Sequence, residues 1–167
     1  EHLTETGLNC CNGEFSDNNT FLGDFYNLKL ALYGSGTTER SIVCNNLDFT
    51  KEHGILILTG PNRGGKTILT QAIGLVFLLF QQGVFVPCSS ADIKICDGIY
   101  THFPVDENKT LSLGRLGEES ERFCKICQVA TAKSLILFNE SFSTTSHTES
   151  IYIAEDIIKY LCCLGAR

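Results

Sequence analysis

Short apolar runs alternate along the chain with longer apolar or amphipathic segments. Residues 54–60 (GILILTG) have the pattern of a strand buried on both faces, and residues 67–82 that of a helix apolar nearly all round, packed between layers. The runs VFVP (84–87), ADIKICDGIYTHF (91–103) and LILF (135–138) predict further strands. Strands alternating with helices predict an α/β fold with a mostly parallel sheet flanked by helices.

The second half of the chain predicts two more helices. One is expected over about residues 114–132. The other is marked by a capping box, in which Ser146 caps the first turn and Glu149 follows three positions later. This helix is therefore expected to start near His147 and to stop near Gly165.

The composition fits one globular domain that buries a core. The chain has 167 residues, of which 43% are hydrophobic and 19% charged. Residues 1–24 are polar and poorly patterned, so we expect a linker or the edge of an upstream domain there, and a single domain over 25–167. Because the chain begins with Glu1 and contains no Met, we expect it to be a piece of a longer protein.

Charge and hydropathy argue against nucleic acid and membrane as direct partners. The net charge of −6 does not favour DNA binding, whose affinity comes largely from Lys and Arg neutralising phosphates, so other domains are expected to supply any DNA contact. The longest apolar run, residues 72–80, is far shorter than the roughly 20 residues that span a bilayer. With no signal peptide visible, we expect an intracellular, cytoplasmic protein.

Nine cysteines are distributed through apolar, helix-like segments, and we expect free thiols rather than disulfides. Cys124 and Cys127 have the C-x-x-C spacing of metal ligands, but no second such pair completes four ligands. We therefore interpret them as small buried residues on one helix face.

The segment GPNRGGKT, residues 60–67, fits the phosphate-loop pattern G-x-x-x-x-G-K-[ST] between a predicted strand and a predicted helix. Its glycines let the backbone approach phosphate oxygens, and the helix N-terminus favours an anion. Lys66 is expected to reach the β- and γ-phosphates, and the Thr67 hydroxyl to bind Mg²⁺. The predicted nucleotide-binding residues are Gly60, Pro61, Asn62, Arg63, Gly64, Gly65, Lys66 and Thr67.

Several motifs, in the same order, resemble the ATPase domain of the MutS family of DNA mismatch-repair proteins, within the ABC-type ATPase group of P-loop NTPases. ILTGPNRGGKT is similar to the family's TGPNMGGKS, and GVFVP followed by ADIKICDGIYT is similar to GSFVPA and IGPIDRIFTR. The later ATAKSLILFNESFSTTS resembles ATEYSLVLMDEIGRGTST. The resemblance runs from about residue 45 to the end of the chain.

The resemblance implies ATP (and its product ADP) as ligand, Mg²⁺ as cofactor, and Glu140 as the residue that polarises or positions the attacking water. It also places residues 110–119, TLSLGRLGEE, at the signature motif that contacts nucleotide held by a partner subunit, where Ser112, Gly114 and Arg115 suit that contact. Residues 141–146 correspond to the segment that crosses the dimer interface. We therefore expect an ATP-favoured homodimer with two composite sites.

Three departures from the family pattern keep other functions open. Arg63 replaces a Met, which brings a charge near the phosphates or leaves a solvated side chain, and Asn139 replaces the Walker B Asp, for which we expect weaker Mg²⁺ affinity. No histidine matches the one that senses the γ-phosphate in the family, so the domain is expected to be incomplete at its C-terminus. The alternatives are an ATP-gated dimerisation module with little hydrolysis and a head domain of another ABC-type DNA-repair ATPase.

Overall fold

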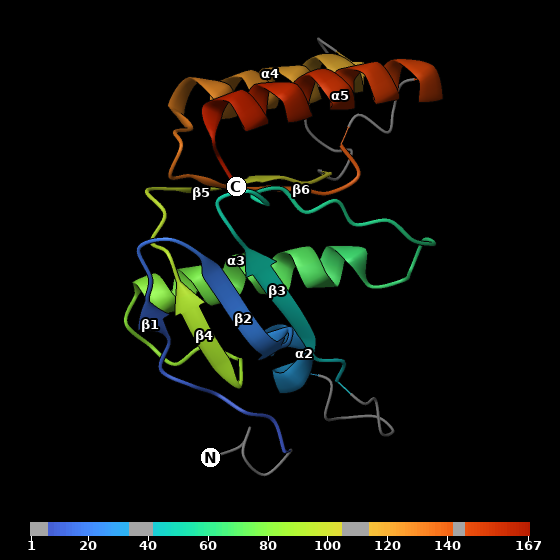
Figure 1. Ribbon diagram of the computed structural model, residues 1–167. Coiled ribbons are helices and arrows are strands. Elements are labelled where there is room, and N and C mark those ends of the chain that lie inside the picture. The colour runs from blue at the N-terminus through green and yellow to red at the C-terminus, as the bar shows by residue number, and fades with distance from the viewer. Residues whose placement is uncertain (1–6, 34–41, 105–113, 142–145) are drawn as a thin grey trace. The chain divides into compact units, whose positions relative to one another are not determined.

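The computed structural model describes residues 7–33, 42–104, 114–141 and 146–167, in two compact units. Unit 1 comprises Glu1–Ile95 and unit 2 comprises Cys96–Arg167. Both combine helices and strands (Figure 1), so the expected mixture of α and β elements is confirmed.

Unit 1 is built on a four-stranded sheet in the order β1-β4-β2-β3. β1 and β4 run parallel, whereas β2 is antiparallel to both β4 and β3. The prediction of a mostly parallel sheet is therefore wrong for this sheet, which is mixed. The strands are β1 (Glu14–Phe15), β2 (Thr20–Phe25), β3 (Asn45–Phe49) and β4 (Ser90–Ile93).

The sheet has one buried and one exposed face because buried and exposed positions alternate along its strands. Helix α3 (Lys66–Gln81) covers the buried face (Figure 1). Its Ile73, Val76 and Phe77 lie in the core, whereas Leu78 on the same helix is 49% exposed. The helix thus buries one side, and the expectation that it is packed between layers is not met within the described residues.

The polar N-terminal segment contributes to this sheet. Thr20 and Leu22 of β2 are fully buried, and β2 pairs with strands on both of its edges. The boundary expected at residue 24 falls inside β2, so residues 14–24 belong to the sheet of unit 1. The sequence does not predict this strand because it is only six residues long and lies between the turn at Ser16 and the short helix α2 (Leu28–Tyr33).

Two of the predicted strands do not form as expected. Residues 54–60 follow an extended path with no strand assigned, and Leu56 and Ile57 are 46% and 66% exposed. Within residues 84–87, Val86 makes a single antiparallel bridge with Cys11. A strand needs a partner edge for its backbone groups, and an apolar run in the sequence does not reveal whether one is available.

The long predicted strand over residues 91–103 is divided into two. β4 ends at Ile93 in unit 1, and β5 (Ile99–His102) starts in unit 2. Between them, Asp97 is hydrogen-bonded within unit 2, where its N–H donates to the Lys133 carbonyl at 3.3 Å. The chain therefore leaves one sheet and joins another within the five residues 94–98.

Unit 2 consists of two parallel strands and two helices. β5 pairs with β6 (Leu135–Phe138), with Ile99 opposite Leu135 and His102 opposite Phe138. Arg167 pairs with the other edge of β6, since its N–H donates to Ser134 and its carbonyl accepts from Ile136. The prediction of a buried strand over 135–138 is confirmed.

Helices α4 (Gly114–Val129) and α5 (His147–Leu164) lie on one side of these strands (Figure 1). The Tyr160 hydroxyl of α5 donates to the Cys127 carbonyl of α4 at 3.2 Å. The predicted start of the helix is confirmed: Ser146 is the N-cap, and its Oγ accepts from the Glu149 N–H at 3.3 Å. Gly165, in the left-handed region at φ 77°, ends α5 as predicted.

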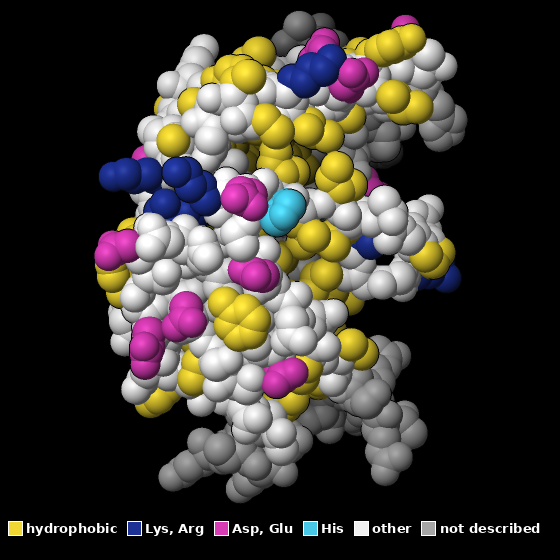
Figure 2. All heavy atoms as spheres, viewed as in Figure 1, with side chains coloured by type: hydrophobic (Ala, Val, Ile, Leu, Met, Phe, Trp, Pro, Cys, Tyr) yellow, Lys and Arg dark blue, Asp and Glu magenta, His cyan; other side chains and the backbone are white. Residues whose placement is uncertain are grey.

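Hydrophobic side chains are present at the surface of both units (Figure 2). Ile151 and Tyr152 in the first turns of α5 are 66% and 65% exposed. Cys124 is also exposed, which corrects the interpretation of Cys124 and Cys127 as buried residues on one face. Among the described residues, no helix is long and apolar enough to cross a membrane.

Candidate functional site

The phosphate loop connects the extended residues 54–59 to helix α3 in unit 1. Gly60 has φ 148° and Gly65 φ 87°, a region that residues with a side chain rarely adopt. The Gly64 N–H donates to the Pro61 carbonyl at 3.1 Å, and a Cβ on Gly64 would lie 2.9 Å from that oxygen. The glycines at 60, 64 and 65 are therefore required by the curled shape of this loop.

Lys66 starts α3 and folds back over the loop. Its Nζ donates to the carbonyl oxygens of Gly60 and Pro61, both at 2.8 Å. The loop therefore places an ammonium group directly against its own backbone. The Thr70 hydroxyl donates to the Lys66 carbonyl one turn later, which anchors the start of the helix.

The N-terminus of α3 has the features of an anion site. Its N-cap is Gly65, which makes no side-chain cap hydrogen bond to the first turn. Thr67 lies in that turn and is partly buried. Asn62 and Arg63 are exposed, and Arg63 is in the left-handed region at φ 67°. The amides of a helix N-terminus, the helix dipole and an ammonium group together suit phosphate oxygens.

The second group of predicted site residues follows β6 in unit 2. Asn139 comes directly after the strand, and its N–H donates to the His102 carbonyl at 3.1 Å. Glu140 is exposed and has φ 46°, in the left-handed region. The next residue, Ser141, is partly buried and is bonded to His102. A carboxylate at this strand end is therefore open to solvent.

His102 connects this strand end to helix α4 and was not singled out by the sequence. Its side chain is 1% exposed, with Nδ1 2.6 Å from the Ser141 Oγ and Nε2 3.0 Å from the Glu119 carbonyl oxygen. The available signal was register: in a parallel pair, the last residues of β5 and β6 reach the same edge. His102 lies opposite Phe138 there.

The remaining predicted residues are only partly described. Gly114 and Arg115 form the first turn of α4, while Ser112 lies outside the described residues. Of the segment expected to cross a dimer interface, Ser141 and Ser146 are described and 142–145 are not. The phosphate loop belongs to unit 1, and Asn139 and Glu140 belong to unit 2.

Among the described residues, there is no group of three or more His, Cys, Asp and Glu side chains that could bind a metal ion. The predicted ligands Thr67 and Asn139 offer a hydroxyl and an amide. Both are oxygen donors of the kind that Mg²⁺ takes together with phosphate oxygens.

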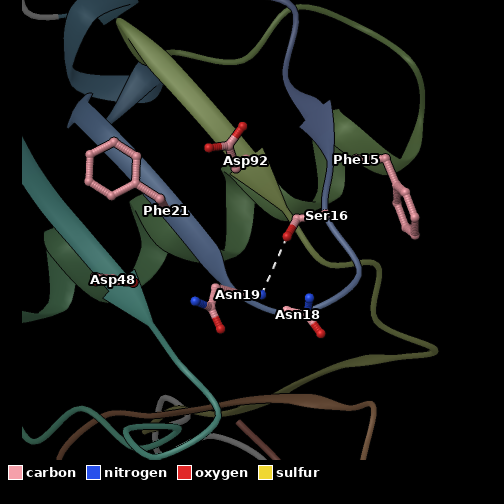
Figure 3. Close-up of a pocket in the computed structure, with 7 residues that line it drawn as sticks. All are labelled: Phe15, Ser16, Asn18, Asn19, Phe21, Asp48 and Asp92. Carbon is pink, nitrogen blue, oxygen red and sulfur yellow. Dashed lines mark hydrogen bonds between the residues drawn. The ribbon is translucent and has the colours of Figure 1, made fainter.

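A pocket of about 560 Å³ lies on the exposed face of the four-stranded sheet (Figure 3). Phe15 and Phe21 lie on opposite sides, with Asp92 between them. Its carboxylates and side-chain amides offer no ammonium group or helix N-terminus to a phosphate, so the predicted nucleotide site is elsewhere. The pocket is lined by Phe15, Ser16, Asn18, Asn19, Phe21, Asp48 and Asp92.

Residues 56–166 match the family described as MutS domain V, and the match extends through both units. The DNA mismatch repair protein MutS of Prochlorococcus marinus (strain AS9601) is 32% identical over 124 residues, which are 74% of this chain and 14% of that protein. The DNA mismatch repair protein MutS of Clostridium botulinum (strain Hall) is 34% identical over 113 residues, 68% of this chain and 12% of that protein. The matched part is thus a small fraction of either relative's length.

Proposed function

Because the chain belongs to the MutS domain V family, we propose that it is the ATP-binding and ATP-hydrolysing part of a MutS-like DNA mismatch-repair protein. The observation that carries the proposal is the phosphate loop, with its three glycines, its lysine and an uncapped helix N-terminus. We further propose that this ATPase part has the P-loop NTPase fold, with ATP and ADP as ligands.

In this proposal Lys66 exchanges the two carbonyl oxygens that it now contacts for the β- and γ-phosphate oxygens of ATP. The exchange replaces two neutral acceptors by charged ones, which form stronger hydrogen bonds with an ammonium group. The amide groups at the start of α3 bind the same phosphates. Arg63 is exposed beside them and adds positive charge.

Glu140 is the proposed catalytic carboxylate. Its exposed position after β6 lets it orient water and accept a proton from it. Mg²⁺, held by the Thr67 hydroxyl and through water by Asn139, would supply charge neutralisation on the phosphate oxygens. An amide in place of a carboxylate at 139 lowers the charge offered to the metal, so Mg²⁺ affinity is reduced.

The proposal extends to a partner of the same kind. Ser112, Gly114 and Arg115 contact the nucleotide of a second copy, so that two chains complete two sites. DNA is bound by other parts of the longer protein, because the chain itself is acidic.

A second candidate function is an ATP-gated dimerisation module with little hydrolysis. Asn139 favours it, since the residue before the glutamate no longer brings a charge to the metal. The two candidates differ in the role of Glu140. In the first it is needed for ATP hydrolysis, and in the second its replacement changes the hydrolysis rate little.

The test is the substitution Glu140→Gln in the intact protein. The proposed ATPase should lose about a hundredfold or more of its turnover, as is usual when a general base is removed, and ATP affinity should be retained. Steady-state ATP hydrolysis is measured at several protein concentrations, and the rate per subunit is expected to rise with concentration until the dimer is saturated.

The matched control is Glu155→Gln, which removes an exposed carboxylate of α5 from the same unit. Its rate should equal that of the wild type. Equal rates in the wild type and Glu140→Gln would reject the catalytic assignment, and a rate per subunit independent of concentration would reject the composite site.

A further inference from the structure

We propose that His102 is a positioning residue for ATP hydrolysis, which fixes the backbone of Glu140 by holding the residues on either side of it. The inference rests on the proposed ATPase function and concerns a residue that no motif identified. It is carried by the hydrogen bonds that Asn139 and Ser141 make to His102 and by the burial of the imidazole.

The two neighbours of Glu140 are both bonded to His102. On one side the Asn139 N–H donates to the His102 carbonyl at 3.1 Å. On the other side the Ser141 Oγ lies 2.6 Å from His102 Nδ1 and 3.2 Å from the His102 carbonyl oxygen. Glu140 therefore lies between two residues, Asn139 and Ser141, that are each hydrogen-bonded to His102.

This attachment matters because Glu140 has φ 46°. A residue with a side chain occupies the left-handed region at an energetic cost, and it stays there only when its surroundings hold it. The bonds from residues 139 and 141 to His102 provide that constraint. The same constraint sets the direction in which the carboxylate leaves the backbone.

The hydrogen-bond partners define the state of the ring. A carbonyl oxygen only accepts, so Nε2 carries the hydrogen that is donated to Glu119. With one hydrogen on the ring, Nδ1 is then an acceptor, and the single hydrogen of the Ser141 hydroxyl is shared between Nδ1 at 2.6 Å and the His102 carbonyl oxygen at 3.2 Å. Because His102 is 1% exposed, water does not compete for these bonds.

His102 is itself held by helix α4. Besides the bond to Glu119, the Arg122 guanidinium donates to the Phe103 carbonyl at 2.8 Å, one residue beyond His102. The ring packs against Phe138 with centroids 5.6 Å apart, and Phe138 contacts Phe123 of α4 at 6.0 Å. The imidazole therefore joins the strand end that bears Glu140 to the helix that begins at Gly114.

A Ser–His pair can also act as a nucleophile and base, but the burial excludes that use here. His102 is almost fully enclosed, and its second nitrogen lies 3.0 Å from the backbone carbonyl oxygen of Glu119. The exposed group at this strand end is Glu140. The geometry thus assigns the pair to orientation rather than to chemistry.

The decisive substitution is Ser141→Ala in the intact protein, which removes one hydroxyl and leaves His102 in place. We expect kcat for ATP hydrolysis to fall about tenfold while KM changes less than about twofold, because an interaction that orients a catalytic group acts in the transition state rather than in binding. The matched control is Ser89→Ala, which removes a serine bonded to Gly23 and Asp24 in unit 1 and should leave both constants unchanged.

Two substitutions of His102 separate positioning from packing. In His102→Asn the amide takes the place of Nδ1 and retains the bond to Ser141, whereas in His102→Gln it takes the place of Nε2 and retains the bond to Glu119. We expect His102→Asn to retain several-fold more kcat than His102→Gln, although glutamine is closer to histidine in volume. A purely structural role gives the opposite order.

All variants are assayed beside Glu140→Gln, well below the lowest unfolding midpoint of the set. If Glu140→Gln abolishes hydrolysis but Ser141→Ala matches Ser89→Ala, or His102→Gln is at least as active as His102→Asn, the positioning role is rejected and the ATPase assignment stands. If Glu140→Gln hydrolyses ATP at the wild-type rate, the proposed function fails and the positioning role fails with it.

Discussion

At the residue scale, Asn139 departs from the family pattern, which has an Asp at this position. It lies between the buried strand β6 and Glu140. Its N–H donates to the His102 carbonyl, which ties its backbone to the end of β5. The amide oxygen accepts hydrogen bonds from metal-bound water but carries no charge. The consequence to expect is a change in metal affinity rather than a loss of the site.

Replacing Asn139 with Asp restores a carboxylate at this position. We expect the Mg²⁺ concentration that gives half-maximal ATP hydrolysis to fall several-fold, because a charged oxygen binds a hard cation more tightly than an amide oxygen does. The measurement is the rate of hydrolysis over a Mg²⁺ titration at fixed ATP. The control is Asn18→Asp, which adds the same charge at an exposed position of unit 1; equal shifts in both variants would contradict a role for residue 139.

Individual residues were predictable from the sequence where a motif fixes them. The glycines of the phosphate loop and Lys66 were recognised from spacing, and the positive φ of Gly60 and Gly65 agrees with the expected close wrap of the backbone. His102 could not be found this way, because its role depends on which strand lies beside β5. That pairing joins residues 36 positions apart, and local patterns carry no information about it.

At the element scale, helix ends were predictable and strand partners were not. The capping box at Ser146 and the glycines that follow α3 and α5 act within a few residues, so they can be read locally. The division of residues 91–103 into β4 and β5 depends on Asp97, whose partners are far along the chain. Asp97 Oδ1 accepts from the Ser134 hydroxyl at 2.8 Å, and Oδ2 accepts from the Thr131 hydroxyl.

These bonds predict a pH dependence of stability. The hydroxyl of Thr131, and next that of Ser134, hold the pKa of Asp97 below its usual value near 3.8. Because the folded-state pKa is lowered, the stabilisation is fully present above the unfolded-state pKa of about 3.9 and is lost as pH falls through the folded-state pKa. In Asp97→Asn, the loss of folding stability that comes from protonating Asp97 at low pH should be absent.

The measurement is urea unfolding of the wild type and Asp97→Asn at neutral pH and at pH values below about 4. The difference in stability between the two should shrink as the pH falls. Asp156→Asn, an exposed change on α5, serves as the control. A stability difference that is constant over this pH range would contradict the assigned role of the Asp97 carboxylate.

At the scale of the whole molecule, the family match extends over both units, and the proposed chemistry divides between them. The phosphate loop is in unit 1, and Glu140 with its supporting His102 is in unit 2. The sequence predicted both parts but gave the wrong sheet for unit 1, because a mixed sheet and a parallel one can be built from similar apolar runs. Exposed apolar residues such as Ile57 and Ile151 occur in both units.

The most direct test of the central claim is a calorimetric titration of the intact protein with ATP and Mg²⁺, for the wild type and for Lys66→Ala. Lys51→Ala, an exposed lysine of unit 1 outside the loop, is the control. We predict one nucleotide per chain, an affinity reduced about tenfold or more in Lys66→Ala because a charged contact to phosphate is lost, and no change in Lys51→Ala. Equal affinity in the wild type and Lys66→Ala would contradict nucleotide binding at this loop.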